Sequence, residues 1–118
     1  MPYKKHISEI DTDLVIEIVC GYLKVNEINI FEKNNEKKIV NARFTVFFVL
    51  SRIFKIDLTE IAKIFNMTHG AVFYGSDKIF NNIILYRESK TQYNDIRKLI
   101  EKRMKDIIII PEAKDLKL

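Results

Sequence analysis

The sequence predicts a single all-α domain, and three observations support this fold class. Glycine and proline are scarce, with three and two residues in a chain of 118, which fits long helices with short joints better than a sheet with many turns. Hydrophobic residues make up 47% of the chain, enough to build one core at this length without a metal or a disulfide. Apolar residues recur at helical spacing along most of the chain. We therefore expect residues 1–118 to form one helical domain.

The first predicted helix covers about residues 13–23. Asp11 and Thr12 precede it and are residue types that cap helix starts. Residues 25–31 predict a short turn or a single helical turn, and the polar stretch 32–38 predicts an exposed loop. The inward face of the first helix follows the i, i+3, i+4, i+7 spacing and comprises Val15, Ile18, Val19 and Tyr22.

Residues 39–54 carry conflicting signals. The stretch from Phe44 to Leu50 is rich in β-forming residues, so propensity alone favours a strand. The apolar character continues to Phe54, however, and about 16 residues are long for a strand and ordinary for a buried helix. We therefore predict a helix, with a core aromatic set of Phe44, Phe47, Phe48, Phe54 and Phe65.

Two helices joined by a short turn are predicted after this segment. Asp57 stands three residues before Glu60, which suggests a capping box with Asp in place of Ser or Thr. A turn over residues 66–68 ends with Thr68, which is suited to cap the second helix. The predicted inward residues are Leu58, Ile61, Ala62 and Phe65 in the first helix and Val72, Gly75, Ser76, Ile79 and Ile83 in the second.

A last helix is predicted over about residues 91–107, followed by an extended stretch over 108–111 and a loose end. Its predicted inward residues are Ile96, Leu99, Ile100, Met104 and Ile107. Its basic residues form either a second phosphate-contacting element or a solvated face with pairs such as Glu101–Lys105. These basic residues are Lys98, Lys102, Arg103 and Lys105.

The two helices around residues 66–68 have the minimum geometry of a helix-turn-helix. In that motif the first helix packs across the DNA backbone and the second presents its N-terminal residues to base edges. This hypothesis places Lys55 and Lys63 near phosphates, where a solvated surface is the alternative, and it leaves Tyr74, off the apolar face, free for a phosphate. The residues expected to face bases are Thr68, His69, Gly70 and Phe73.

Composition limits the partners and the compartment. The formal net charge of +4 permits a polyanion without demanding one, and residues 39–87 hold six Lys and Arg against three Asp and Glu. The single cysteine, Cys20, excludes an intrachain disulfide, is expected to be buried, and fits a reducing cytoplasm. No stretch approaches 18 apolar residues and no signal peptide is evident, so we expect a cytoplasmic protein without a membrane partner.

Catalysis is not expected from this sequence. We find no nucleophile–base pair, carboxylate pair or metal cluster with a usable spacing. Two histidines and one cysteine, far apart, make a poor metal site. No G-x-x-x-x-G-K-[ST] motif is present, so neither nucleotide binding nor a cofactor is expected.

Four segments, by their order and spacing along the chain, carry a resemblance to a known family. They are Val19–Ile28, Ile39–Thr45 (similar to "VARxRQ"), Asp57–Phe65 (similar to "SLPEIGxxF") and His69–Val72 with Lys78-Ile79 (similar to "DHxTV…xKI"). From Leu14 to Ile84 the chain resembles the C-terminal DNA-binding domain of the bacterial replication initiator DnaA, a helical fold related to the Trp repressor. The resemblance implies a Trp-repressor-like core over about residues 14–84, containing the helix-turn-helix, with an added C-terminal helix.

The resemblance also implies roles for individual residues. His69 matches the family's recognition-surface His, Arg43 matches an Arg that reaches into the minor groove, and Lys78 matches a Lys that contacts phosphate or stays solvated. Thr68 replaces the family's Asp, and Gly70 and Ala71 replace two hydroxyl residues. These departures thin out the groups that hydrogen-bond bases, so a different target or weaker discrimination is expected.

Three functions follow as hypotheses. The first is a double-stranded DNA-binding protein that regulates replication or transcription. The second is a helical protein-interaction module that kept the fold and lost base reading, and the third is a structured-RNA binder. One exposed positive face would favour DNA, whereas an exposed apolar patch elsewhere would favour the interaction module.

Overall fold

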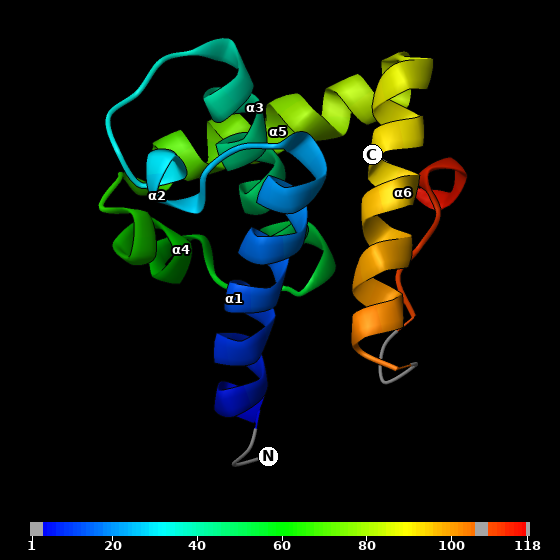
Figure 1. Cartoon of the computed structure of the whole chain (residues 1–118), viewed down its shortest axis with the longest axis horizontal. Coiled ribbons are helices and arrows are strands. Elements are labelled where there is room, and N and C mark those ends of the chain that lie inside the picture. Colours follow the sequence, from blue (N-terminus) through cyan, green and yellow to red (C-terminus); the bar gives the residue numbers. More distant parts are fainter. Residues whose placement is uncertain (1–3, 106–108, 118) are drawn as a thin grey trace.

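A computed structural model of the chain describes residues 4–105 and 109–117, with side chains described from residue 12 onward. Within these residues every regular secondary-structure element is a helix, which confirms the all-α prediction. Figure 1 shows α4 and α6 at opposite sides of the molecule, with α5 running from one to the other. The elements are α1 (Lys4–Leu23), α2 (Glu27–Ile30), α3 (Lys37–Phe48), η1 (Val49–Ile53), α4 (Leu58–Phe65), α5 (His69–Leu85), α6 (Arg87–Arg103) and η2 (Ala113–Asp115).

The central helix α3 forms the middle of the core and resolves the conflict between helix and strand. Every residue from Val46 to Leu50 is at most 1% exposed, and a helix that is apolar all round belongs inside a protein. The chain continues from α3 into one π-helical turn, η1, in which the Phe54 amide donates to the Val49 carbonyl. The hydroxyl of the half-buried Ser51 donates to the Phe47 carbonyl at 2.7 Å, so this polar group is satisfied by the preceding helical turn.

The first helix is longer than the sequence pattern indicates. It begins at Lys4 instead of about Asp13, so Asp11 and Thr12 lie inside α1 and the prediction that they cap its start is wrong. Residues 4–20 contain neither glycine nor proline, so nothing in the chain stops the helix before the apolar face begins. Cys20 is buried, as predicted.

The second half of the core depends on a close approach between α3 and α5. All five predicted inward residues of α5 are buried. A Cβ atom built on Gly75 would lie 2.5 Å from a ring carbon of Phe44, which real side chains do not tolerate. Glycine at this position therefore sets the distance between the two helices.

The last helix begins and ends four residues earlier than predicted, at Arg87 and Arg103. Tyr86 alone separates α5 from α6, and its extended backbone (φ −119°, ψ 134°) turns the chain. Leu99 is 42% exposed, so its predicted inward position is wrong. Ile107, also predicted inward, lies outside the described residues. Glu101 pairs with Arg97 instead of with Lys105.

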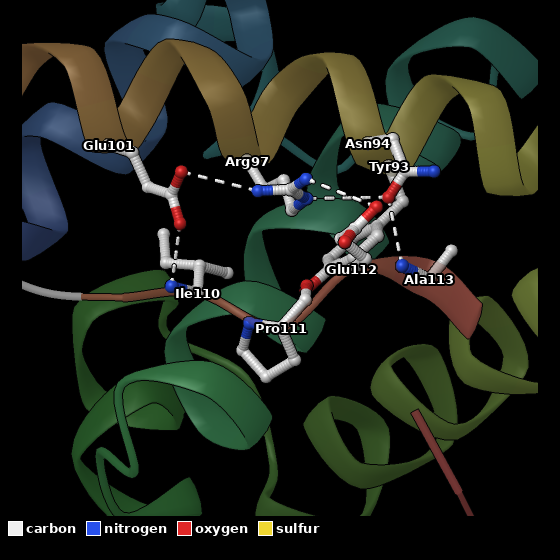
Figure 2. Close-up of polar contacts among 8 residues, drawn as sticks. All are labelled: Tyr93, Asn94, Arg97, Glu101, Ile110, Pro111, Glu112 and Ala113. Atoms are coloured by element: carbon white, nitrogen blue, oxygen red, sulfur yellow. Dashed lines mark hydrogen bonds and ion pairs between the residues drawn. The ribbon is translucent and has the colours of Figure 1, made fainter. Parts of the chain in front are cut away.

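The C-terminal segment is docked on α6, so the prediction of a loose end is wrong. Figure 2 shows residues 110–113 lying along the helix. The Tyr93 hydroxyl donates to the Pro111 carbonyl at 2.8 Å, and the Ile110 amide donates to the Glu101 carboxylate at 2.7 Å. The Ala113 amide donates to the Asn94 side-chain oxygen at 2.8 Å. These bonds satisfy backbone groups that a loop would otherwise leave to water, and they hold Ile110 in a buried position.

Candidate nucleic-acid interface

The helix-turn-helix is formed by α4, a three-residue turn and α5. Asn66 ends α4 in the left-handed conformation (φ 53°), which Asn adopts more readily than most residues. The Met67 amide donates back to the Ala62 carbonyl at 2.9 Å, which closes the turn. These local contacts fix the direction in which α5 leaves the turn.

The two predicted helix caps have different outcomes. The Thr68 hydroxyl accepts a hydrogen bond from the Ala71 amide at 3.1 Å, which confirms it as the N-cap of α5. Asp57 occupies the N-cap position of α4, but its side chain makes no capping hydrogen bond, so the predicted capping box is not formed. The extended backbone of Asp57 (ψ 136°) starts α4 without it.

The N-terminal half of α5 presents an exposed surface made of four of the predicted site residues. His69 and Gly70 are exposed, and open space surrounds the position where a Gly70 side chain would lie. Phe73 and Tyr74, one turn further along, are 54% and 59% exposed. Side chains on a helix lean in general toward its N-terminus. We call the set His69, Gly70, Phe73 and Tyr74 the recognition surface.

Tyr74 is held in place by two neighbours. Its ring meets the ring of Phe44 edge to face, with 6.0 Å between centroids. The Lys78 ammonium lies 5.9 Å from the centroid of the Tyr74 ring, at the outer limit of a cation–π contact. The predicted residues Tyr74 and Lys78 therefore form one small cluster on the side of α5 that faces α3.

A groove with a positive lining runs along this side of α5. It has a volume of about 290 Å³, and Lys37 and Lys78 lie on it with Asn41 and Asn82. Lys37 was not among the residues predicted from the sequence. Two lysines in the first turn of α3 oppose the helix dipole, which favours acidic residues there. That mismatch is a feature of the sequence that could have drawn attention to Lys37.

The groove on the other side of α5 has a balanced charge. It has a volume of about 320 Å³, and Arg52, Lys55, Asp57, Phe73 and Asp77 contribute to its lining. Two cations and two carboxylates cancel formally, so this side attracts phosphate less than the side with Lys37 and Lys78. Lys55 is exposed and has a left-handed backbone (φ 60°).

Lys63 lies on α4 and Thr68 at its junction with α5, and both are exposed. The recognition surface thus has Lys55 beside Phe73 on one side and Lys78 beside Tyr74 on the other. Lys63 stands one turn before the α4–α5 junction. The DNA contacts of all these residues stay predictions.

Arg43 is the exception among the predicted site residues. Only 6% of it is exposed, and its guanidinium donates to the carbonyls of Ile30 (2.7 Å), Glu32 (2.8 Å) and Asn34 (3.3 Å). Burial lowers the pKa of Arg43, although a guanidinium stays charged in proteins. The structure contradicts the expectation that Arg43 lies free for a minor groove, because the irregular loop before α3 needs its donors.

Other kinds of site find little support in the described part of the chain. No group of three or more His, Cys, Asp or Glu residues lies together in a way that could hold a metal ion among residues 4–105 and 109–117. No helix in the same ranges is long and apolar enough to span a membrane.

Comparison with known proteins gives one family and weak relatives within it. Residues 12–79 match the family model described as the bacterial dnaA protein helix-turn-helix. The chain is 27% identical over 73 residues to the chromosomal replication initiator protein DnaA of Oleidesulfovibrio alaskensis, which covers 62% of this chain and 16% of that protein. It is 26% identical over 93 residues to the protein of the same name from Leptospira biflexa, covering 79% of this chain and 20% of that protein. The chain therefore spans about a fifth or less of the length of these relatives.

Proposed function

This chain belongs to the bacterial DnaA helix-turn-helix family, and from that premise we propose that it binds double-stranded DNA by placing the N-terminal half of α5 in the major groove. One observation carries the proposal. The recognition surface lies exposed at the helix end that a helix-turn-helix inserts, with the cations Lys55 and Lys78 beside it.

The proposed docking assigns phosphate contacts unequally. Lys37 and Lys78 line the groove without an opposing carboxylate, so they contribute most of the salt-dependent attraction. Lys55 shares its groove with Asp57 and Asp77 and contributes less. Lys63 contacts the backbone through α4, the helix that crosses the phosphates in this motif. Arg43 has no part, because its donors are used inside the protein.

The test is a fluorescence-anisotropy titration of random-sequence duplex DNA at two salt concentrations. Binding weakens as salt rises from about 50 mM to about 200 mM, with a slope of roughly −0.9 per phosphate contact. His69→Ala and Lys63→Ala both weaken binding. Lys37→Gln and Lys78→Gln each reduce the slope by about 1.

The matched control is Lys114→Gln, which removes the same charge from an exposed position on η2, beside α6 and at the opposite side of the molecule from α4 (Figure 1). This variant keeps the wild-type slope. Absence of binding at about 50 mM salt, where phosphate attraction is strong, would rule out the proposal.

We further propose that DNA binding by this chain regulates replication or transcription. Support comes from its similarity to proteins named for initiating chromosomal replication. Mapping the sites bound by the tagged protein across its own genome tests this role. Enrichment at an origin or at promoters supports it, and an even distribution contradicts it.

A second candidate function, a protein-interaction module, rests on a separate observation. Ile28, Phe31 and Ile64 are exposed on α2, its C-cap and α4, and Phe31 stacks on Phe65 at 4.7 Å between ring centroids. Exposed large apolar side chains are typical of contact surfaces where they form a continuous patch. Loss of DNA binding in the titration above would favour this function. Strong salt-dependent binding would favour DNA.

A further inference from the structure

Phe73 has an environment unlike that of the other large aromatic residues near the helix-turn-helix. It is 54% exposed, and none of the rings described in the structure stacks against it. Tyr74, its neighbour, meets Phe44 and Lys78, and Phe31 stacks on Phe65. Contact between an exposed phenyl ring and a partner is favourable because it removes the apolar surface of the ring from water.

The residues that precede Phe73 at the start of α5 have little capacity to read bases through hydrogen bonds. Gly70 and Ala71 have no polar side chain. The Thr68 hydroxyl accepts a hydrogen bond from the Ala71 amide and thereby caps the helix. His69 is the one remaining polar side chain at the start of α5 before Phe73. Direct reading by this surface therefore depends largely on apolar contact.

Apolar contact in the major groove selects one base. Thymine alone carries a methyl group at C5 on the major-groove edge, and aromatic or small apolar side chains recognise it by packing. Phe73 lies one turn into α5, within the part of a recognition helix that reaches base edges. Beside it, the open space at Gly70 leaves room for a base edge to approach the ring.

The balanced charge on this side of α5 also favours discrimination among DNA sequences over general attraction to the phosphate backbone. The groove that Phe73 lines contains Arg52 and Lys55 with Asp57 and Asp77. Because the four charges balance formally, the net pull on any phosphate backbone is small here. A contact made on this side separates one sequence from another instead of strengthening binding to all of them.

We propose that Phe73 determines DNA specificity by packing its ring against the C5 methyl of a thymine in the target site. This inference rests on the proposed function, because it requires that α5 enters the major groove. On the recognition surface, apolar contact by Phe73 would then take the place of hydrogen bonds to base edges.

The experiment compares thymine with deoxyuridine, which lacks only the C5 methyl and keeps the pairing and the charge. Sites are first selected from a random duplex pool with the wild-type protein. Each thymine of the selected site is then replaced by deoxyuridine in turn, and binding is measured by anisotropy. The variants are Phe73→Ala, Phe73→Leu and, as a matched control, Tyr86→Ala, which removes an exposed aromatic side chain at the far end of α5.

Wild type and Tyr86→Ala lose about fourfold in affinity at one or two thymines, the value expected for one buried methyl group. Phe73→Ala binds the thymine and deoxyuridine duplexes equally, and Phe73→Leu keeps part of the difference. Thermal unfolding of each variant shows that it is folded under the assay conditions.

Two outcomes overturn the inference while the proposed function stands: wild type binds all deoxyuridine duplexes as tightly as thymine duplexes, or Phe73→Ala keeps the full difference. If the wild-type protein binds no duplex in the salt titration, both the proposed function and the inference fail. The salt titration therefore separates failure of the function from failure of the inference.

Discussion

Replacing Arg43 by methionine tests whether this side chain serves the fold or the DNA. The guanidinium makes two short hydrogen bonds, to the carbonyls of Ile30 and Glu32, and a longer one to Asn34. A hydrogen bond from a charged donor contributes about 1.5 kcal/mol or more to stability. With the longer bond left out and methionine preserving the packing of the alkyl chain, we expect the free energy of unfolding to fall by about 3 kcal/mol.

Urea unfolding followed by circular dichroism measures this loss. Arg43→Lys keeps the charge but has no planar fork with which to reach separate carbonyls, so it loses about half as much, on the order of 1–2 kcal/mol. Lys38→Gln is the matched control, since this exposed residue is also near the start of α3. Its unfolding free energy stays within about 0.5 kcal/mol of wild type.

The affinity of the folded Arg43→Met protein for DNA stays near the wild-type value, because the guanidinium is buried in the protein and does not face the DNA. The opposite pattern refutes this reasoning. If Arg43→Met keeps its stability and loses duplex binding, then Arg43 leaves the loop to contact DNA, as the family resemblance implies.

Three further predictions concern the core and the C-terminal segment. Gly75→Ala lowers the free energy of unfolding by about 1–3 kcal/mol in urea, because the added Cβ would meet the Phe44 ring at 2.5 Å; unchanged stability would mean that the ring moves away freely. Ile110→Ala costs about 2 kcal/mol in the same assay, because the docked segment buries this side chain, and the salt slope of duplex binding stays at the wild-type value; a lowered slope would place the segment near DNA. Burial raises the pKa of the Cys20 thiol from 9.0 to about 11, so the folded state holds this proton more tightly than the unfolded state and stability is lost as pH rises from 9.0 to about 11. Cys20→Ala loses less stability over that range than wild type, and equal losses would contradict the role of the thiol.

Local patterns in the sequence were sufficient for the helix-turn-helix. The inward residues of α4 and α5 follow helical spacing, and Thr68 caps α5 as its side-chain chemistry suggests. These features depend on contacts within three or four residues along the chain, which periodicity and capping rules describe well. The residues that line the recognition surface follow from the same periodicity, because they lie off the apolar face of α5.

The length of the apolar run predicted the helix of α3 against its β propensity, whereas the order of the C-terminal segment depends on distant contacts that these rules do not describe. The β-forming stretch in α3 is helical because packing surrounds it on all sides. The C-terminal segment is ordered because its backbone amides find acceptors on α6, such as Glu101, nine residues before Ile110 in the chain. Periodicity carries no information on such pairs.

The sequence by itself determined the helical class, the helix-turn-helix and the exposure of His69, Phe73 and Tyr74, since each depends on spacing along one helix. Only the tertiary structure decided that Arg43 bonds the loop before α3 and that Lys37 joins Lys78 in one groove. The reason is physical. The hydrogen-bond donors of a long side chain reach groups that are distant in the sequence. The charges of Lys37 and Lys78 act together only because α3 packs on α5.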